Sequence, residues 1–354
     1  MKRKAFILVA ALILGVLTQP AAGQATIDNL VFPEGTATQP LGSLGGVKKG
    51  GDGPHTLILL AGAPFGSEVW SGFMERNAER YTMYAVTPAG YAGTSPPPLP
   101  DDPAAFVPPV WTEALYQGLL ELVEKEGLER PVLVGQHLMS VHYVLRMAQM
   151  HPDRFSGVVA IAGNPYGPLA GGGTRLPSEN QQSSFISQNF VPFYRTVSLQ
   201  TWRAGDYPAS AFSQDPVKGR AYELLQESVP LPQQLRYFLE FLSTQTRLAL
   251  SEIQVPVLAL LPQANVDSAY TTALNNGMSR EQVEEYLVKK YGSLKKAHRE
   301  LRKSTAWEPY RSQFQDVRIL YPADSGLFMM ADRPEFVDGA IAAFVEEVTA
   351  SAED

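Results

Sequence analysis

The sequence contains no cysteine, and only five of its 354 residues are histidines. The first absence excludes disulfide bonds, thiolate nucleophiles, cysteine-ligated metals and lipidation at a cysteine. The second leaves few side chains that could act as an imidazole base near neutral pH. The fold must therefore be stabilised by its hydrophobic core, for which 45% apolar residues are sufficient.

The sequence also lacks an apolar run long enough for a helix to cross a bilayer, which needs about 20 residues. The run Ala5 to Leu17 follows three basic residues and precedes a stretch of small ones. This pattern is typical of a secretory signal peptide. We therefore predict a signal at residues 1–25, cleaved after Gly23 or Ala25, and a periplasmic or secreted protein with no membrane span after cleavage. An uncleaved membrane anchor is the alternative.

Positive charge is scarce as well, since 29 lysines and arginines accompany 36 acidic residues and give a formal charge of −7. Removal of the predicted signal takes away three basic residues and changes the charge from −7 to −10. An acidic surface repels polyanions, so we predict no nucleic-acid partner and no attraction to anionic membranes.

Metal ions and other cofactors are not predicted. His137 and His142 are close in sequence, but a spacing of five residues directs two side chains to different faces of a helix. No carboxylate joins them in a pattern typical of metal ligands. The two histidines therefore do not indicate a metal site.

What the sequence does contain is a series of short runs rich in Val, Ile and Leu, separated by helix-length patterns. Such runs are typical of strands buried on both faces. Strands are predicted over 56–61, 83–87, 131–135, 157–162, 255–261 and 317–321, and helices over 69–79, 111–126, 138–150, 280–303 and 334–348. This alternation predicts an α/β fold with a mainly parallel central sheet flanked by helices.

The alternation stops between residues 164 and 252. A segment of this length is too long for an ordinary loop. We therefore predict an inserted helical cap over 164–252, packed on a core formed by 26–163 and 253–350. A second independent domain is the alternative.

One predicted strand leads directly into a motif with a known chemical use. The sequence Pro131-Val-Leu-Val-Gly-Gln-His-Leu-Met-Ser140 has the form of a strand, a G-x-nucleophile-x-G turn and a helix. His137 occupies the nucleophile position, and no G-x-S-x-G occurs elsewhere in the chain. Met139 replaces the second glycine, whose small size allows the turn to pack closely. We therefore expect Met139 to relax or displace the turn, although histidine tolerates positive φ.

The order of the motifs resembles the α/β-hydrolase superfamily over residues 55–344. Four blocks carry the resemblance: 59–70, beginning Leu59-Leu-Ala-Gly-Ala-Pro, 84–95, 133–154 and 326–335, with sequence Gly-Leu-Phe-Met-Met-Ala-Asp-Arg-Pro-Glu. In that superfamily they correspond to the oxyanion loop, the following glycine-rich block, the nucleophile elbow with its helix, and the loop of the catalytic histidine. The resemblance implies an α/β-hydrolase fold with a cap.

The same resemblance implies that the catalytic triad is lost. It places His137 at the nucleophile position, Asn265 at the acid position and Leu327 at the base position. The backbone amides of Gly62, Ala63 and Leu138 are predicted to form a site for an anion or a carbonyl oxygen, because side-chain substitution does not remove them. The sequence therefore predicts a pseudohydrolase that binds a small apolar ligand with a carbonyl or carboxylate, or that binds a protein partner.

Catalytic alternatives remain open at this point. Ser140 could act as a displaced nucleophile with His137 as its base, and Asp267 or Asp324 could orient that histidine. His137 could itself be a nucleophile or acid–base group in non-hydrolytic chemistry. Asp332 is interpreted as a cap or loop anchor. Several aromatic residues could line an apolar pocket or pack in the core: Phe65, Trp70, Tyr166, Phe193, Tyr194, Trp202 and Tyr207.

Overall fold

The computed structural model describes residues 40–98, 105–166, 177–192, 209–228, 231–262, 278–297, 307–322 and 325–350. The predicted signal peptide lies outside these ranges, as do Asn265, Asp267 and Asp324. Four of the aromatic residues proposed for a pocket also lie outside them: Phe193, Tyr194, Trp202 and Tyr207.

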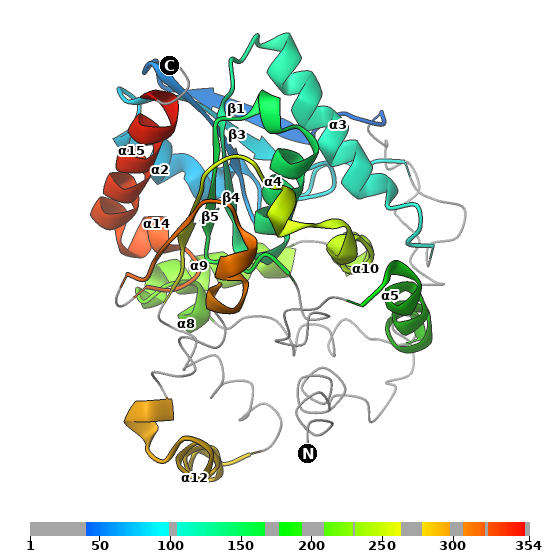
Figure 1. Ribbon diagram of the computed structural model, residues 1–354, viewed down its shortest axis with the longest axis vertical. Helices are drawn as coiled ribbons and strands as arrows, with labels where there is room; N and C mark the ends of the chain where they lie inside the picture. The colour runs from blue at the N-terminus through cyan, green and yellow to red at the C-terminus, as the bar shows by residue number, and fades with distance from the viewer. Residues whose placement is uncertain are drawn as a thin grey trace.

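The described strands form one seven-stranded sheet with the order β1-β3-β2-β4-β5-β6-β7 (Figure 1). They are β1 (Gly46–Gly50), β2 (His55–Leu60), β3 (Tyr81–Thr87), β4 (Val132–Gln136), β5 (Gly157–Ile161), β6 (Val257–Leu260) and β7 (Val317–Leu320). β1 pairs antiparallel with β3, and the other neighbours pair parallel. The predicted α/β fold with a mainly parallel sheet is confirmed, and all six predicted strands are present.

Helices cover both faces of the sheet. Helices α3 (Val110–Lys125) and α4 (His137–Met150) lie on one face, and α2 (Ser71–Arg76) and α15 (Pro334–Ala350) lie on the other (Figure 1). Alternation along β2 serves both layers, because Ile58 and Leu60 pack with α3 and α4 while Leu57 and Leu59 pack with α2 and α15. Two apolar layers therefore hold the sheet from opposite sides.

The helix predicted over 280–303 is wrong in its length. Helix α12 (Arg280–Tyr291) begins with a capping box formed by Ser279 and Gln282 and ends at Tyr291. Gly292 follows in a left-handed conformation, with φ of 87°. A glycine in this conformation terminates a helix, so a helical pattern that continues beyond it does not extend the same helix.

Several helices lie between β5 and β6, in the region predicted to be a cap. The described ones are α5 (Glu179–Phe185), η5 (Ile186–Phe190), α8 (Ala209–Phe212), α9 (Pro216–Ser228), α10 (Leu231–Thr244), η6 (Gln245–Arg247) and η7 (Leu250–Glu252). The Tyr237 hydroxyl of α10 donates to the carbonyl oxygen of Ala89, which follows β3. The carbonyl oxygen of Phe212 accepts from the amide of Phe328, which follows β7. These helices thus contact loops at the carboxyl ends of the strands, and the limits of the cap remain a prediction.

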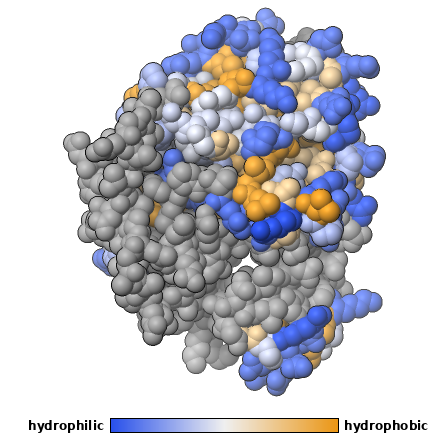
Figure 2. All heavy atoms as spheres, turned by 180° about the vertical axis from the view of Figure 1, so that it is seen from behind, coloured by the Kyte–Doolittle hydropathy of each residue, from blue (hydrophilic) through white to orange (hydrophobic). Residues whose placement is uncertain are grey.

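The remaining described elements are short. They are the 3-10 helices η2 (Ser67–Trp70), η3 (Pro152–Arg154) and η8 (Glu308–Gln313), and the one-turn helix α14 (Met329–Asp332). None of the helices in the described ranges is long and apolar enough to cross a membrane. On the side of the molecule opposite to that in Figure 1, the described residues are mostly hydrophilic, with hydrophobic areas between them (Figure 2).

Candidate functional site

The candidate site is centred on the turn between β4 and α4. Strand β4 ends at Gln136 and helix α4 begins at the next residue, His137. His137 has a positive φ of 68°, the left-handed conformation that is uncommon for residues other than glycine. The strained geometry of a nucleophile elbow is therefore retained with histidine at its apex, and the expectation that Met139 relaxes the turn is wrong.

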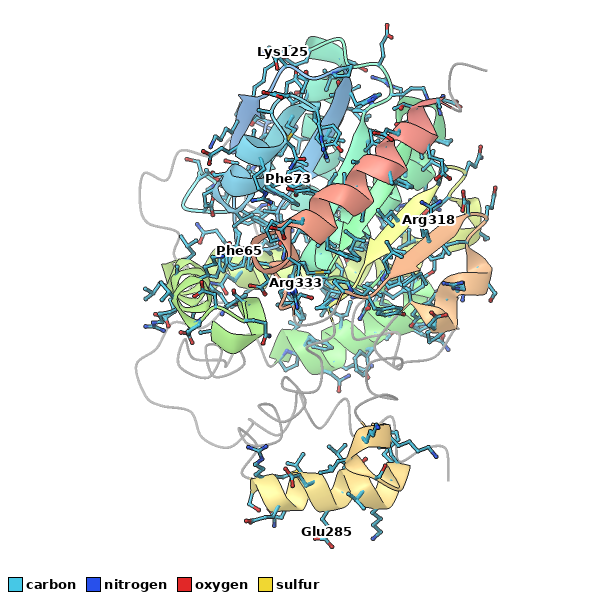
Figure 3. All side chains as sticks on the ribbon, turned by 90° about the vertical axis from the view of Figure 1, so that its left-hand side faces the viewer. Phe65, Phe73, Lys125, Glu285, Arg318 and Arg333 are labelled. Atoms are coloured by element: carbon cyan, nitrogen blue, oxygen red, sulfur yellow. The ribbon has the colours of Figure 1, made fainter. Side chains whose placement is uncertain are left out.

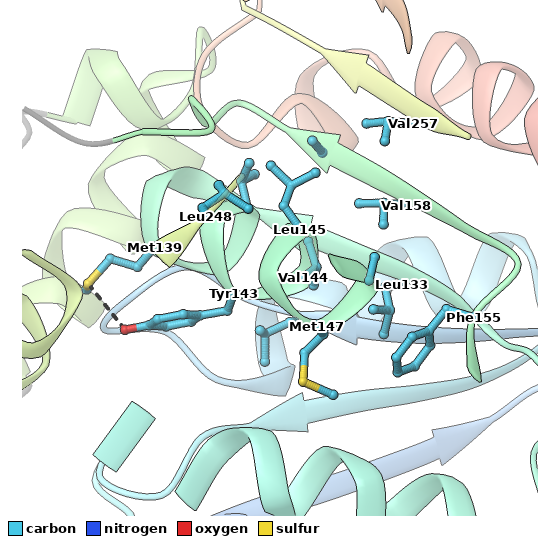
Figure 4. Packing of buried hydrophobic residues seen from close by; sticks show 14 of the residues in the cluster. Leu133, Met139, Tyr143, Val144, Leu145, Met147, Phe155, Val158, Leu248 and Val257 are labelled. Carbon is cyan, nitrogen blue, oxygen red and sulfur yellow. Dashed lines mark hydrogen bonds between the residues drawn. The ribbon is translucent and has the colours of Figure 1, made fainter. Parts of the chain in front are cut away.

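Met139 fits because its side chain extends along the helix rather than toward the strand. It is buried, and the Tyr143 hydroxyl donates to its sulfur at 3.9 Å (Figure 4). Close packing of α4 is provided by two other glycines. A Cβ added to Gly135 would lie 2.6 Å from the carbonyl oxygen of Ser140, and one added to Gly163 would lie 2.8 Å from that of His137.

The loop after β2 approaches the elbow just as closely. A Cβ added to Gly62 would lie 2.3 Å from the Cβ of His137 and 2.8 Å from the carbonyl oxygen of Gln136. The Gly62 amide donates to the side-chain oxygen of Gln136 at 3.1 Å. Of the three predicted ligand-binding amides, that of Gly62 is therefore already engaged. Ala63 lies one residue further along this loop, and Leu138 lies in the first turn of α4, where amides have no partner within the helix.

Ser140 is the residue that the sequence offers as an alternative nucleophile. Its side chain is fully buried, and its hydroxyl donates to the carbonyl oxygen of Ala61, which directly follows β2. This bond ties the first turn of α4 to the neighbouring strand. Ser140 is therefore a packing residue in the first turn of the helix.

Leu327 also lies beside the elbow, although the two positions are far apart in sequence. Its carbonyl oxygen accepts from the side-chain nitrogen of Gln136 at 3.0 Å. Its side chain is partly buried and packs with the apolar layer that contains α15. The fold thus brings His137 and Leu327 to one place, where the leucine side chain offers no group that could take up or release a proton.

Asp332 anchors the loop that contains Leu327, as predicted. Its carboxylate accepts from the Gly326 amide at 2.7 Å and from the Gln214 amide at 3.1 Å. It also accepts from the Ser213 hydroxyl. One carboxylate therefore holds the loop and the segment after α8 together.

Aromatic rings close this side of the site. Phe65 follows the oxyanion-type loop and lies beside α14 (Figure 3). Its ring centroid is 5.1 Å from that of Phe328 in an edge-to-face arrangement, and Tyr222 of α9 stacks on Phe328 at 3.7 Å. Phe212 completes a cluster of four rings, of which Tyr222 is partly buried and the other three are buried. Phe65, Trp70 and Tyr166 are all buried, so these three members of the proposed pocket pack in the interior.

Loss of hydration keeps the histidines near the elbow neutral. It lowers the pKa of His137 from 6.5 to about 4, although the side chain is partly exposed. Burial likewise lowers the pKa of His142 to about 4. In the His142 ring, Nδ1 lies 3.2 Å from the carbonyl oxygen of Pro165 and Nε2 lies 3.4 Å from the Thr244 hydroxyl. Within the described ranges, no group of three His, Asp or Glu residues is arranged to hold a metal ion.

A comparison with protein families supports what this geometry indicates. Residues 57–340 match the model described as the alpha/beta hydrolase family. The chain belongs to the alpha/beta hydrolase family. A search of curated proteins finds no match.

Solved structures of the alpha/beta hydrolase fold resemble the chain at low sequence identity. A monoacylglycerol lipase from Paleococcus ferrophilus is 18% identical, with a TM-score of 0.52 over 86% of this chain and 98% of that chain. An esterase from Exiguobacterium antarcticum is 14% identical, with a TM-score of 0.51 over 85% of this chain and 94% of that chain. A 2-hydroxy-6-oxo-6-phenylhexa-2,4-dienoate hydrolase from Rhodococcus sp. strain RHA1 is 14% identical, with a TM-score of 0.52 over 87% and 97%. At these identities the likeness shows a shared fold and not a shared reaction.

Gln136 is the residue of this alpha/beta hydrolase site that the motif analysis did not single out. Its side chain is almost completely buried and bonds to both loops beside the elbow. A polar residue at the end of an otherwise apolar strand was the available signal. The motif gave it no weight, because the position before the nucleophile carries no defined residue type in the G-x-S-x-G pattern.

The buried histidines predict acid sensitivity for this alpha/beta hydrolase. The unfolded chain takes up a proton at His142 near pH 6.5, whereas the folded protein resists it until about pH 4. Stability is therefore greatest above pH 6.5 and falls between pH 6.5 and 4, by on the order of 3 kcal/mol for this group. Urea unfolding across this range should show a smaller loss in His142→Gln, whose amide still donates and accepts but does not titrate.

The matched control is His55→Gln, because His55 lies at the start of β2 and is not fully buried. This variant should retain the pH dependence of the wild type. An equal acid loss in His142→Gln and the wild type would contradict the assignment of the sensitivity to His142.

Proposed function

We propose that this chain is a pseudohydrolase that binds a small apolar molecule through a carbonyl or carboxylate oxygen. The observation that carries the proposal is the occupation of the elbow apex by His137, with φ of 68°, where the chemistry of the fold requires a nucleophilic oxygen. The proposed location is the periplasm or the exterior of the cell, because of the signal-like pattern at residues 1–25.

Triad chemistry needs a nucleophile, an imidazole that takes its proton, and a carboxylate that orients the imidazole. Position 327 offers a leucine beside the elbow, and position 265, aligned with the acid, is an asparagine. Loss of one triad member lowers the rate by a factor on the order of 10⁴ to 10⁶. The effects of losing several members are not additive, because the members act as a unit. We therefore infer that no more than weak oxyanion-type and binding effects remain.

Ser140 offers no replacement for the lost nucleophile in this proposal. Its hydroxyl is buried and donates to the Ala61 carbonyl oxygen, so attack on a substrate would require that bond to break and α4 to move. His137 is neutral near pH 7 because its pKa is about 4. A Ser-His-Asp site needs a carboxylate that orients the imidazole, and the position aligned with the acid, 265, is an asparagine.

Binding remains chemically reasonable because it uses backbone groups. The amides of Ala63 and Leu138 belong to the loop and the helix start that meet at His137. A helix start favours negative charge and hydrogen-bond acceptors. We propose that these two amides bind the ligand oxygen, and that apolar side chains near the loop contact the rest of the molecule.

The second candidate is an enzyme with an atypical site around His137. The observation that favours it is the retained strain at this residue, because strained backbone persists at functional sites. In this alternative, His137 acts as nucleophile or acid–base group. The two candidates differ in whether covalent labelling or turnover depends on His137.

Incubation of the mature protein with a fluorophosphonate probe and with p-nitrophenyl esters is expected to give no labelling and no turnover above the buffer background. The physical reason is that the base position holds Leu327 and that the buried Ser140 hydroxyl donates to the Ala61 carbonyl oxygen. Mass spectrometry of the native protein is expected to reveal a co-purified apolar ligand that carries a carbonyl or carboxylate.

The variants His137→Ala and Ser140→Ala identify the source of any signal. Turnover or labelling that either substitution abolishes would overturn the pseudohydrolase proposal in favour of the atypical enzyme. A signal that persists in both variants would arise from another part of the protein, and the elbow would still be inactive.

A further inference from the structure

Gln136 connects the two loops that flank the elbow. It is the last residue of β4, and its side chain is only 1% exposed. Its side-chain oxygen accepts from the Gly62 amide at 3.1 Å, and its side-chain nitrogen donates to the Leu327 carbonyl oxygen at 3.0 Å. One partner is a donor and the other an acceptor, so the orientation of the amide group is fixed.

These two bonds act on the loops that matter for the proposed site. Gly62 packs against the Cβ of His137, and Ala63 follows it. On the other side, Leu327 precedes Phe328, whose amide donates to Phe212. In a triad hydrolase the catalytic histidine bonds to the nucleophile and so links its loop to the elbow. Leu327 cannot make that link through its side chain.

We infer that Gln136 is the positioning residue of the proposed binding site and supplies the missing link. It holds the Gly62–Ala63 turn against the start of α4, so that the Ala63 and Leu138 amides form a preformed pair for a carbonyl or carboxylate oxygen. The part of this inference that concerns a ligand rests on the proposed function. The part that concerns the order of the two loops does not.

The variant Gln136→Glu tests the inference because its effect depends on pH. A protonated carboxyl group can accept from the Gly62 amide and donate to the Leu327 carbonyl oxygen, whereas the ionised group can only accept. Burial raises the pKa of the introduced group. The link is therefore present at low pH and lost as the pH rises through that pKa.

Other groups near these loops titrate elsewhere or are anchored. His137 is adjacent in the chain and has a pKa of about 4, Asp332 bonds to Gly326, and the pKa of Tyr222, stacked on Phe328, is raised by burial. A change between pH 5 and pH 8 that Gln136→Glu shows and the wild type does not is therefore caused by the introduced carboxyl group.

Gln182→Glu is the matched control. Gln182 is 2% exposed, its side-chain nitrogen donates to the Leu242 carbonyl oxygen, and its side-chain oxygen accepts from the Thr246 hydroxyl at 2.6 Å. It thus makes the same kind of buried bridge, but between α5, α10 and η6 instead of beside the elbow. Substitution there has the same chemistry without the same position.

Amide hydrogen exchange provides the first measurement. In Gln136→Glu at pH 8, exchange in residues 62–65 and 326–330 should be about 10-fold faster than in the wild type after correction for intrinsic rates. At pH 5 it should return to the wild-type level, and Gln182→Glu should leave both segments unchanged at either pH. Unchanged exchange at pH 8, or faster exchange throughout the sheet, would overturn the assignment of Gln136.

The second measurement is a titration with decanoate and with methyl decanoate, monitored by the Ala63 and Leu138 amide resonances. Both signals should shift in the wild type, and binding should weaken about 10-fold in Gln136→Glu at pH 8 but not in Gln182→Glu. A shift caused by only one of the two probes would show whether the site binds the carboxylate or the ester. If the loops open in Gln136→Glu but neither probe shifts the wild-type signals, the loop assignment is supported and the proposed binding function is overturned.

Discussion

Replacement of Glu240 by alanine is expected to destabilise the protein by about 3–5 kcal/mol, because it removes one half of a buried ion pair. Glu240 is fully buried and Arg236, one helical turn before it in α10, is 5% exposed. Burial raises the pKa of Glu240, with the charge of Arg236 opposing the effect. Alanine would leave the guanidinium without its counter-charge in a place that water does not reach.

The carboxylate of Glu240 also caps a helix of the core. One oxygen accepts from the Thr112 amide at 2.8 Å, in the first turn of α3. Arg236 donates to the Ala105 carbonyl oxygen as well as to Glu240. The pair therefore fixes α10, which lies between β5 and β6, to the start of α3, and its loss should separate the two elements.

Urea unfolding measures this prediction, with an exposed pair as the control. Arg318 and Glu347 are 46% and 52% exposed, so Glu347→Ala should cost at most about 1 kcal/mol. If Glu240→Ala does not fold, the same unfolding measurement is made on Glu240→Gln and on the double variant Arg236→Met with Glu240→Leu. The double variant is expected to be closer to the wild type than Glu240→Ala, and a single-variant cost below that of the surface control would contradict the argument.

The inner parallel strands, such as β4, β5 and β6, could be predicted because they are buried on both faces. A continuous apolar run such as 157–162 has the length of a buried strand and is too short for a typical helix. β1 escaped prediction for the opposite reason. Its sequence Gly-Val-Lys-Lys-Gly contains one large apolar residue, and the two lysines belong to an exposed edge, where charge discourages further strand pairing. The opposite edge strand, β7, was predicted because its sequence Val-Arg-Ile-Leu contains three large apolar residues.

The candidate site was predictable as a set of positions and less so as a geometry. The motif placed His137 at the elbow, and the strained φ of 68° agrees with it. The effect of Met139 was misjudged, because the sequence does not reveal that Gly135 and Gly163 provide the close packing of α4. The role of Gln136 depends on two loops, 74 and 191 residues away along the chain, and only the fold brings them together.

The second large effect is expected at Gly62. Substitution by alanine places a Cβ 2.3 Å from the Cβ of His137 and 2.8 Å from the Gln136 carbonyl oxygen, and neither atom is the end of a flexible side chain. The loop after β2 must therefore move away from the elbow. We expect a loss of about 3 kcal/mol in the free energy of unfolding, typical of an overpacked interior, together with loss of ligand binding at Ala63 and Leu138.

Gly339→Ala is the control for this substitution. Gly339 lies in α15, is exposed, and has no atom within 4 Å of an added Cβ. Alanine there should stabilise the protein by about 0.5–1 kcal/mol, because glycine is a poor helix former. The two substitutions thus have opposite expected signs, although the chemical change is the same.

A double variant separates the clash at the elbow from a general intolerance at Gly62. His137→Gly removes the Cβ that lies 2.3 Å from the added methyl group, and glycine accepts the φ of 68° without strain. Combined with Gly62→Ala, it should recover part of the lost stability, while the contact with the Gln136 carbonyl oxygen prevents full recovery. A double-mutant cycle should therefore give a coupling energy of at least about 1 kcal/mol. Additive effects would mean that the oxyanion-type loop does not rest on His137, and would contradict the close approach on which the proposed binding site depends.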